Sequence, residues 1–231
     1  MQGLGNDFVL LEGPLSLSPE EISELCDRRF GVGADGVLVV TRADPVRMEY
    51  WNADGSAAEM CGNGLRCVAR YAYDKGWAAD RNFAVATPVG ERGVRVLEDR
   101  VEAELGRPIL GGERQIQGVG YELVDMGNPH AVRFVDDPAD VDVIAIGSAL
   151  QREFSNGANV EFARVVEGRV EMRVWERGVG ETLACGTGIA AVAAVAAERF
   201  GLDSPVPVRV PGGEAIVHLR DGVAWIVGPT E

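Results

Sequence analysis

The sequence contains one pattern twice. At an offset of 124 positions, residues 46–72 and 170–196 share nine identical amino acids, where a chain of ordinary composition gives about two by chance. In each copy an alternating strand pattern is followed by Cys-Gly-X-Gly and then by an apolar helix pattern, which places Cys61 and Cys185 at equivalent positions. The chain is therefore expected to contain two copies of one module.

Local patterns predict the elements of each copy. Residues 46–53 and 168–176 alternate as half-buried strands do, and residues 93–105 and 214–227 are typical of hairpins. Helices are expected at 17–31, with Ser18 as the cap, Pro19 at the first position and Gly31 as the stop, and at 140–154.

These elements predict an α+β fold of two pseudo-symmetric modules, each a mostly antiparallel sheet wrapped around a central helix. A Gly-rich turn is expected at 109–118. This turn predicts the boundary between the two modules. They are expected at 1–112, completed by the C-terminal strand, and at 113–231.

The two repeated cysteines lie just before predicted helices. Helix starts are expected at about Asn63 and Thr187, which exposes Cys61 and Cys185 to the positive end of a helix dipole and to unpaired backbone N–H groups. Such a site can lower a cysteine pKa from about 8.5 to within roughly 3.5–7.5. We expect the other two cysteines, Cys26 and Cys67, to be small core residues.

Two symmetric thiols at helix starts suggest inversion of a stereocentre. One thiolate removes a proton from carbon, and the opposite thiol returns a proton to the other face. The carbanion beside a carboxylate then depends on preorganised donors in a dry site. A pyridoxal Schiff base is not expected, because the one lysine, Lys75, lies at a predicted helix end.

Composition excludes several other classes. A net charge of −14 and a pI of about 4.6 argue against nucleic acid and anionic membranes as partners. The longest apolar run, Ile189–Ala197, is far below the ~20 residues of a membrane span, and the N-terminus has no signal-peptide pattern. Four cysteines without CxxC, and two histidines without HExxH, predict reduced thiols in the cytoplasm and no metal site. We therefore expect no cofactor.

The motifs together resemble the diaminopimelate epimerase family. The resemblance is carried, in order, by GLGNDFV, GVGADG, WNADGS, EMCGNGLRC, MGNPH, GANVEF and WERGVGETLACGTG. It implies that family's fold and the interconversion of LL- and meso-diaminopimelate, without pyridoxal phosphate, in lysine biosynthesis. It also implies that Cys61 and Cys185 are the acid–base pair, with His130 nearby in a supporting role.

The resemblance further implies a set of substrate-binding residues. They are Asn6, Asn52, Gly62, Asn63, Asn128, Asn159, Glu176, Arg177, Gly186 and Thr187. Neutral asparagines suit a substrate with two zwitterionic heads, and an arginine can bind a carboxylate through two hydrogen bonds. Glu161 and His218 carry no functional signal in the sequence, and Gly36 stands where some family members have a polar side chain.

Other readings stay open at this point. Asn52 could simply shape a loop, Glu176 could pair with Arg177, and His130 could be a structural histidine. The alternative enzyme is a proline or hydroxyproline racemase of the same fold, whose substrate has no second amino-acid head for Asn52, Asn159 and Arg177 to bind. A noncatalytic amino-acid-binding protein would not exchange the α-proton, and a redox protein would use a Cys61–Cys185 disulfide. The expected partner is a small-molecule substrate, with a homodimer as the expected assembly.

Overall fold

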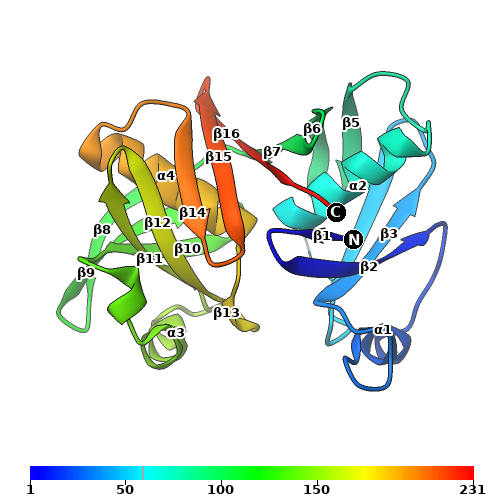
Figure 1. Ribbon diagram of the computed structural model, residues 1–231. Coiled ribbons are helices and arrows are strands. Elements are labelled where there is room, and N and C mark those ends of the chain that lie inside the picture. The colour runs from blue at the N-terminus through cyan, green and yellow to red at the C-terminus, as the bar shows by residue number, and fades with distance from the viewer. Residues whose placement is uncertain (59) are drawn as a thin grey trace. The chain divides into compact units, whose positions relative to one another are not determined.

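A computed structural model describes residues 1–58 and 60–231 (Figure 1). The chain forms two compact units, Met1–Glu104 with Gly228–Glu231, and Leu105–Val227. The chain therefore passes from one unit to the other twice, and the last residues belong to the first unit.

The first unit contains two helices and a run of strands. The helices are α1 (Pro19–Cys26) and α2 (Gly62–Asp74), and the strands are β1 (Gln2–Gly3), β2 (Asn6–Glu12), β3 (Gly36–Thr41), β4 (Val46–Asn52), β5 (Asn82–Thr87), β6 (Gly90–Val96) and β7 (Arg100–Gly106). Strands β1 to β7 lie in chain order, with β2–β3 and β4–β5 parallel and the others antiparallel. Backbone hydrogen bonds between Gln2 and Glu231 attach the end of the chain to β1.

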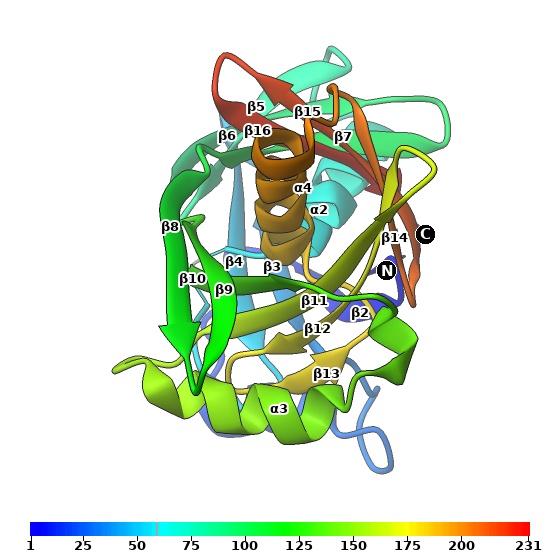
Figure 2. The same ribbon diagram turned by 90° about the vertical axis from the view of Figure 1, so that its left-hand side faces the viewer.

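The second unit repeats this plan. Its helices are α3 (Val143–Leu150) and α4 (Gly186–Phe200), with short 3-10 turns at Pro138–Asp140 and Gln151–Glu153. Its strands are β8 (Ile109–Ile116), β9 (Val119–Asp125), β10 (Pro129–Phe134), β11 (Asn159–Val166), β12 (Arg169–Glu176), β13 (Gly180–Thr182), β14 (Val206–Val210), β15 (Gly213–Arg220) and β16 (Val223–Pro229). Figure 2 shows α4 inside the curved sheet and α3 outside it.

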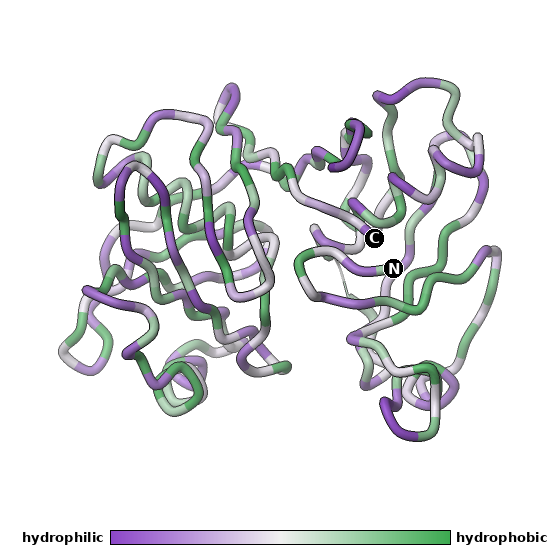
Figure 3. The backbone as a smooth tube through the Cα atoms, in the orientation of Figure 1, coloured by the Kyte–Doolittle hydropathy of each residue, from purple (hydrophilic) through white to green (hydrophobic). Residues whose placement is uncertain are grey.

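The central strand of each unit is buried on both faces. In β3, Val37 and Val39 pack against α1, while β3 also contacts α2. In β11, Val160 and Phe162 pack with residues of α3, and α4 contacts the same strand. Strand β3 accordingly contains a run of hydrophobic residues at 37–40, and hydrophobic and hydrophilic stretches alternate along much of the chain (Figure 3). The expected α+β architecture of two mostly antiparallel sheets, each around a helix, is confirmed.

Two local predictions are wrong. The first helix ends at Cys26 rather than near Gly31, because the Asp27 carboxylate accepts the N–H groups of Arg29 and Phe30 at 2.7 Å and turns the chain. The segment expected as a Gly-rich turn is mostly strand β8, and the turn occupies only Gln117 and Gly118, both with positive φ. Ser18 does cap α1, with the reciprocal Glu21 hydrogen bond of a capping box.

None of the helices in the described part of the chain combines the length and apolar character needed to cross a bilayer.

Candidate active site

Cys61 is the residue that begins helix α2. Its extended backbone (φ −138°, ψ 108°) turns the chain into the helix, and its Sγ accepts the Gly64 N–H at 3.3 Å. A cysteine sulfur thus takes the place of the usual Ser or Asp oxygen at a helix cap. The first-turn N–H groups and the sulfur therefore share one location, as the sequence predicts.

Three predicted binding residues lie beside Cys61. The Asn6 Oδ1 accepts the Cys61 thiol at 3.8 Å and the Asn63 Nδ2 at 3.3 Å. Asp35 accepts the Asn6 Nδ2 at 2.7 Å, which turns the amide oxygen toward the sulfur. Gly62, buried, follows Cys61 directly on the helix.

Arg66 is a buried cation that contacts Gly62 and Asn63. Its side chain has no exposed area, and its Nη atoms donate to Asn63 Oδ1 at 3.0 Å and to the Gly62 carbonyl at 3.3 Å. Burial lowers the pKa of Arg66 to about 10, so the guanidinium remains charged at neutral pH. No pattern in the sequence marks this residue as part of the site, because an arginine is normally a surface group.

Asn52 ends strand β4, and its side chain serves the following loop. Its Nδ2 donates to Ser56 Oγ at 3.0 Å, and its backbone N–H donates to the Ser56 carbonyl at 2.9 Å. Among the described residues, the Asn52 side chain therefore hydrogen-bonds within its own loop and not to the group around Cys61.

Cys185 begins helix α4 in the same way. Its backbone is extended (φ −113°, ψ 115°), and its Sγ accepts the Gly188 N–H at 3.4 Å. The Thr187 Oγ1 lies 3.5 Å from the sulfur and accepts the Asn128 Nδ2 at 3.4 Å. Gly186, Thr187 and Asn128 are thus brought together with Cys185.

A buried His–Glu pair continues this chain of hydrogen bonds. His130 Nδ1 lies 2.6 Å from Glu161 Oε1, and His130 Nε2 lies 3.1 Å from Asn128 Oδ1. Because an amide oxygen only accepts, Nε2 carries the proton that faces Asn128. Both side chains are fully buried, and Glu161 Oε2 has no hydrogen-bond partner in the described part of the chain. Glu161, which carried no signal in the sequence, is therefore the far end of a chain that runs through His130, Asn128 and Thr187 to Cys185.

The remaining predicted residues lie where β11 begins and β12 ends. Glu176 accepts the Thr182 hydroxyl at 2.5 Å and makes no ion pair with Arg177 among the described residues. Asn159 Oδ1 accepts the Arg177 backbone N–H at 2.9 Å, whereas the Arg177 guanidinium is exposed and donates to the Asn156 carbonyl at 3.2 Å. Burial raises the pKa of Glu176, against the opposing hydrogen bonds from Thr182 and Cys185.

The two thiols do not share one electrostatic environment. Burial raises the pKa of Cys185 well above its ordinary value, and the nearby carboxylates of Glu176 and Glu161 raise it further. The hydrogen bonds from Thr187 and Gly188 act in the opposite direction but do not prevail. The expectation that a helix start lowers the cysteine pKa is therefore wrong for Cys185.

Burial also explains the two remaining cysteines. Cys67 is inaccessible, and burial raises its pKa to about 11. Burial likewise raises the pKa of Cys26, which packs in the core under α1. Both are the core residues that the sequence predicts.

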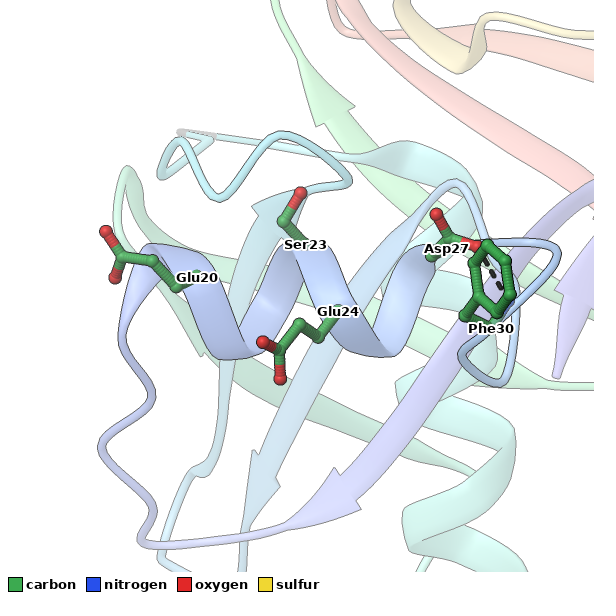
Figure 4. Close-up of a pocket in the computed structure, with 5 residues that line it drawn as sticks. All are labelled: Glu20, Ser23, Glu24, Asp27 and Phe30. Carbon is green, nitrogen blue, oxygen red and sulfur yellow. Dashed lines mark hydrogen bonds between the residues drawn. The ribbon is translucent and has the colours of Figure 1, made fainter.

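A surface hollow beside α1 has a different character. Figure 4 shows its lining residues, Glu20, Ser23, Glu24, Asp27 and Phe30. All five are exposed, and they include neither a thiol nor a basic group. In residues 1–58 and 60–231 no three His, Cys, Asp or Glu side chains are grouped as ligands for a metal ion.

Known proteins show the same motifs and fold. The family model described as diaminopimelate epimerase matches residues 1–110 and 122–228. The diaminopimelate epimerase of Thermobifida fusca is 43% identical over 98% of this chain and 92% of its own length. That of Desulfitobacterium hafniense is 38% identical over 99% of this chain and 93% of its own length.

Solved structures show a wider likeness in fold. A phenazine biosynthesis protein of the PhzF family from Bacillus anthracis has a TM-score of 0.74 at 15% identity, covering 99% of this chain and 92% of its own. A hydroxyproline epimerase from Agrobacterium vitis, with bound trans-4-hydroxy-L-proline, has a TM-score of 0.72 at 16% identity, covering 99% and 86%. At such identities only the fold is shared, whereas the near-complete sequence matches identify the family. The chain belongs to the diaminopimelate epimerase family.

Proposed function

We propose that this protein interconverts LL- and meso-2,6-diaminopimelate in lysine biosynthesis by a two-base reaction without a cofactor. The observation that carries this proposal is the matched pair of thiols. Cys61 and Cys185 each begin a helix, and each sulfur accepts the N–H group three residues later, at 3.3 and 3.4 Å. Equivalent thiols in two copies of one module suit a reaction that uses an acid and a base in turn.

The proposed reaction moves one proton on each side of the α-carbon. A thiolate removes the α-proton and becomes a thiol, while the opposite thiol protonates the other face and becomes a thiolate. We call Cys61 with the start of α2 the first half-site, and Cys185 with the start of α4 the second. Both thiols must act on one α-carbon when substrate is bound. The N–H groups at the starts of α2 and α4, including those of Gly62, Asn63, Gly186 and Thr187, would hold the α-carboxylate and stabilise charge that spreads onto it.

The other predicted residues would recognise the rest of the substrate. Asn159 Oδ1 accepts the Arg177 backbone N–H at 2.9 Å, and this contact between the two residues supports their joint assignment to the distal amino-acid head. Asn6 and Asn128 each lie next to a cysteine or its neighbour. Asn52 is also proposed to contact the distal head, and a variant tests it separately because its side chain hydrogen-bonds within a loop.

Proton NMR in D₂O tests the function directly. LL-diaminopimelate is incubated with reduced enzyme, and both the α-proton signal and the meso isomer are followed. Loss of one α-proton signal together with appearance of the meso isomer is the expected result. Cys61→Ser and Cys185→Ser variants, checked for folding by circular dichroism, serve as controls.

The same experiment separates the alternatives. Exchange with L-proline or hydroxyproline, but not with diaminopimelate, would identify a proline-type racemase. Substrate binding without exchange at the α-carbon, in folded protein, would identify a binding protein. Asn52→Ala should raise KM for diaminopimelate if Asn52 contacts the distal head, and should leave KM unchanged if it only shapes its loop.

Reduced thiols are required for this chemistry, and a disulfide between the two cysteines would abolish it. We therefore also propose a reducing compartment, the cytoplasm, as the place of action. A homodimer is proposed as the assembly, and light scattering of the purified protein tests it.

A further inference from the structure

The two copies of the module have diverged in the charges around their cysteines. Cys61 and Cys185 are equivalent, and so are the glycines that donate to them, Gly64 and Gly188. The hydrogen bonds at these helix starts are nearly equal in length. Any difference between the thiols must therefore come from their burial, since Cys61 is half-buried and Cys185 is buried, and from the surrounding side chains.

The first difference lies inside the helices. Arg66, in the first turns of α2, corresponds to Ala190 in α4 at the same offset from the cysteine. The Arg66 guanidinium reaches back to the Gly62 carbonyl, as helical side chains do, so its charge lies toward the helix start. Arg66 is fully buried, and residues 1–58 and 60–231 provide it with no carboxylate partner.

The second difference lies in the central strands. Leu38 of β3 is paired with Tyr50, one residue before Trp51, and Glu161 of β11 is paired with Val174, one residue before Trp175. The two therefore occupy equivalent positions. A Cβ on Gly64 would lie 2.9 Å from Leu38 Cδ2, and one on Gly188 would lie 2.7 Å from Glu161 Oε1.

A third difference adds to the second. Asn52 ends β4, and Glu176 ends β12 at the equivalent position. The first half-site thus has leucine and asparagine where the second has two glutamates. Since charges in a buried region are screened weakly, these substitutions add to the burial of Cys185 in making its sulfur the harder of the two to ionise.

We propose that the two thiols differ in the enzyme without substrate: Cys61 rests as the thiolate, stabilised by the buried Arg66, and Cys185 rests as the thiol, held protonated beside Glu161 and Glu176. The resting enzyme then removes the α-proton that faces Cys61. After the reaction Cys61 has gained that proton and Cys185 has lost its own, so solvent must accept a proton from Cys61 and return one to Cys185. This catalytic consequence rests on the proposed function, whereas the difference in protonation does not.

Other charged groups face Cys61 but are more exposed. Asp35 holds Asn6, and both Asp35 and Asp7 pair with Arg28, the three side chains being 41%, 38% and 56% exposed. Water and salt screen exposed charges, so this cluster acts more weakly than the wholly buried Arg66. The amino terminus lies in the same unit and acts on Cys67 as a further cation.

Three ionisable side chains surround Cys185 from three strands. They are His130 on β10, Glu161 on β11 and Glu176 on β12. His130 Nδ1 lies 2.6 Å from Glu161 Oε1 and offsets part of the charge of that carboxylate, which leaves Glu176 as the stronger of the two carboxylates that act on Cys185. Glu176 accepts hydrogen bonds from the Thr182 hydroxyl and the Cys185 thiol, and its carboxylate disfavours a thiolate at Cys185.

Thiol labelling at several pH values tests the proposal on the free protein. Iodoacetamide is applied in brief pulses from about pH 5 to 10, and mass spectrometry of fragments quantifies Cys61 and Cys185 separately. The midpoint of each pH profile reports protonation independently of how accessible the sulfur is. We expect the Cys61 midpoint at least about one unit below that of Cys185. Equal midpoints, or the reverse order, would overturn the proposal.

Variants of the buried arginine test its cause. Arg66→Met should raise the Cys61 midpoint by about one unit, a tenfold lower thiolate fraction at neutral pH, while Arg66→Lys should restore most of the wild-type value. Arg70→Met, one turn further along α2, is the matched control and should leave the midpoint unchanged. An unchanged midpoint in folded Arg66→Met would refute the role of Arg66. If that variant does not fold, the order of the two wild-type midpoints decides.

The labelling needs no substrate, so its outcome is independent of the assay for epimerisation. A protein that shows the expected order but exchanges no diaminopimelate α-proton would refute the proposed function alone. A protein that epimerises diaminopimelate with two equal midpoints would refute this inference alone.

Discussion

Replacing Glu161 by leucine should destabilise the second unit strongly. Glu161 and His130 are fully buried, 2.6 Å apart, and leucine would leave His130 Nδ1 without a partner inside the protein. Removing one partner of a buried pair costs about 3–5 kcal/mol. For a chain of this length, 3 kcal/mol lowers Tm by about 6–12 °C.

The other copy of the module supplies the compensating change. Leu38 on β3 is the equivalent of Glu161 on β11. Phe8 on β2 is the equivalent of His130 on β10, because each lies two residues before the residue that pairs with Leu38 or with Glu161. The double variant His130→Phe/Glu161→Leu therefore recreates an apolar pair that this fold already accommodates. We expect its stability to return to within about 1.5 kcal/mol of the wild type.

Thermal melts of the wild type, both single variants and the double variant, in reductant, complete the cycle. The coupling between the two sites should be at least about 2 kcal/mol. A Glu161→Leu variant that melts within about 2 °C of the wild type would show that the buried pair contributes little. A double variant that loses the sum of the single losses would show that the two side chains do not act as a unit.

Three further outcomes are expected. Cys61→Ser and Cys185→Ser should each reduce epimerisation at least about 100-fold, the scale of general acid–base catalysis, and a variant that retains more than a tenth of the activity contradicts the two-base reaction. Because burial raises the pKa of Glu176, its stabilising contribution is present below the pKa of the unfolded chain and is lost as pH rises through the higher native pKa. Glu176→Gln should therefore gain Tm relative to the wild type as the pH rises above about 4.3, the ordinary glutamate pKa, and a Tm difference that stays constant with pH argues against this linkage. Ser18→Ala removes the α1 capping box and should lower the free energy of unfolding, measured in thermal melts, by about 1 kcal/mol. Its kcat should be unchanged, and a lower kcat would contradict a purely structural role of the cap.

The cysteine positions followed from the sequence because their signals are local. A repeated Cys-Gly-X-Gly before an apolar helix pattern specifies a helix start wherever it occurs, and both sulfurs cap their helices as that pattern predicts. The strand patterns were equally local. The end of α1 was missed because an Asp27 turn stops the helix before Gly31 is reached.

Glu161 and Arg66 were missed for a different reason. Alternation along a strand normally separates a buried face from an exposed one, but β11 is buried on both, so a glutamate between Val160 and Phe162 points to α4 rather than to water. Its burial depends on His130 and Gly188, which are distant in sequence. Arg66 likewise is buried by glycines from both ends of the chain, Gly3 and Gly228.

The position of Gly228 has a consequence for synthesis on the ribosome. The second unit is continuous in the chain and can fold once Val227 has emerged, but the first unit waits for Gly228–Glu231. A Cβ on Gly228 would lie 3.1 Å from the Arg66 guanidinium, and Glu231 is joined to Gln2 by backbone hydrogen bonds. The half-site around Cys61 is therefore completed last, although its residues are made first. A chain that stops before Gly228 lacks the segment that packs against Arg66, so the side chains around Cys61 are assembled only after residues 228–231 have been made.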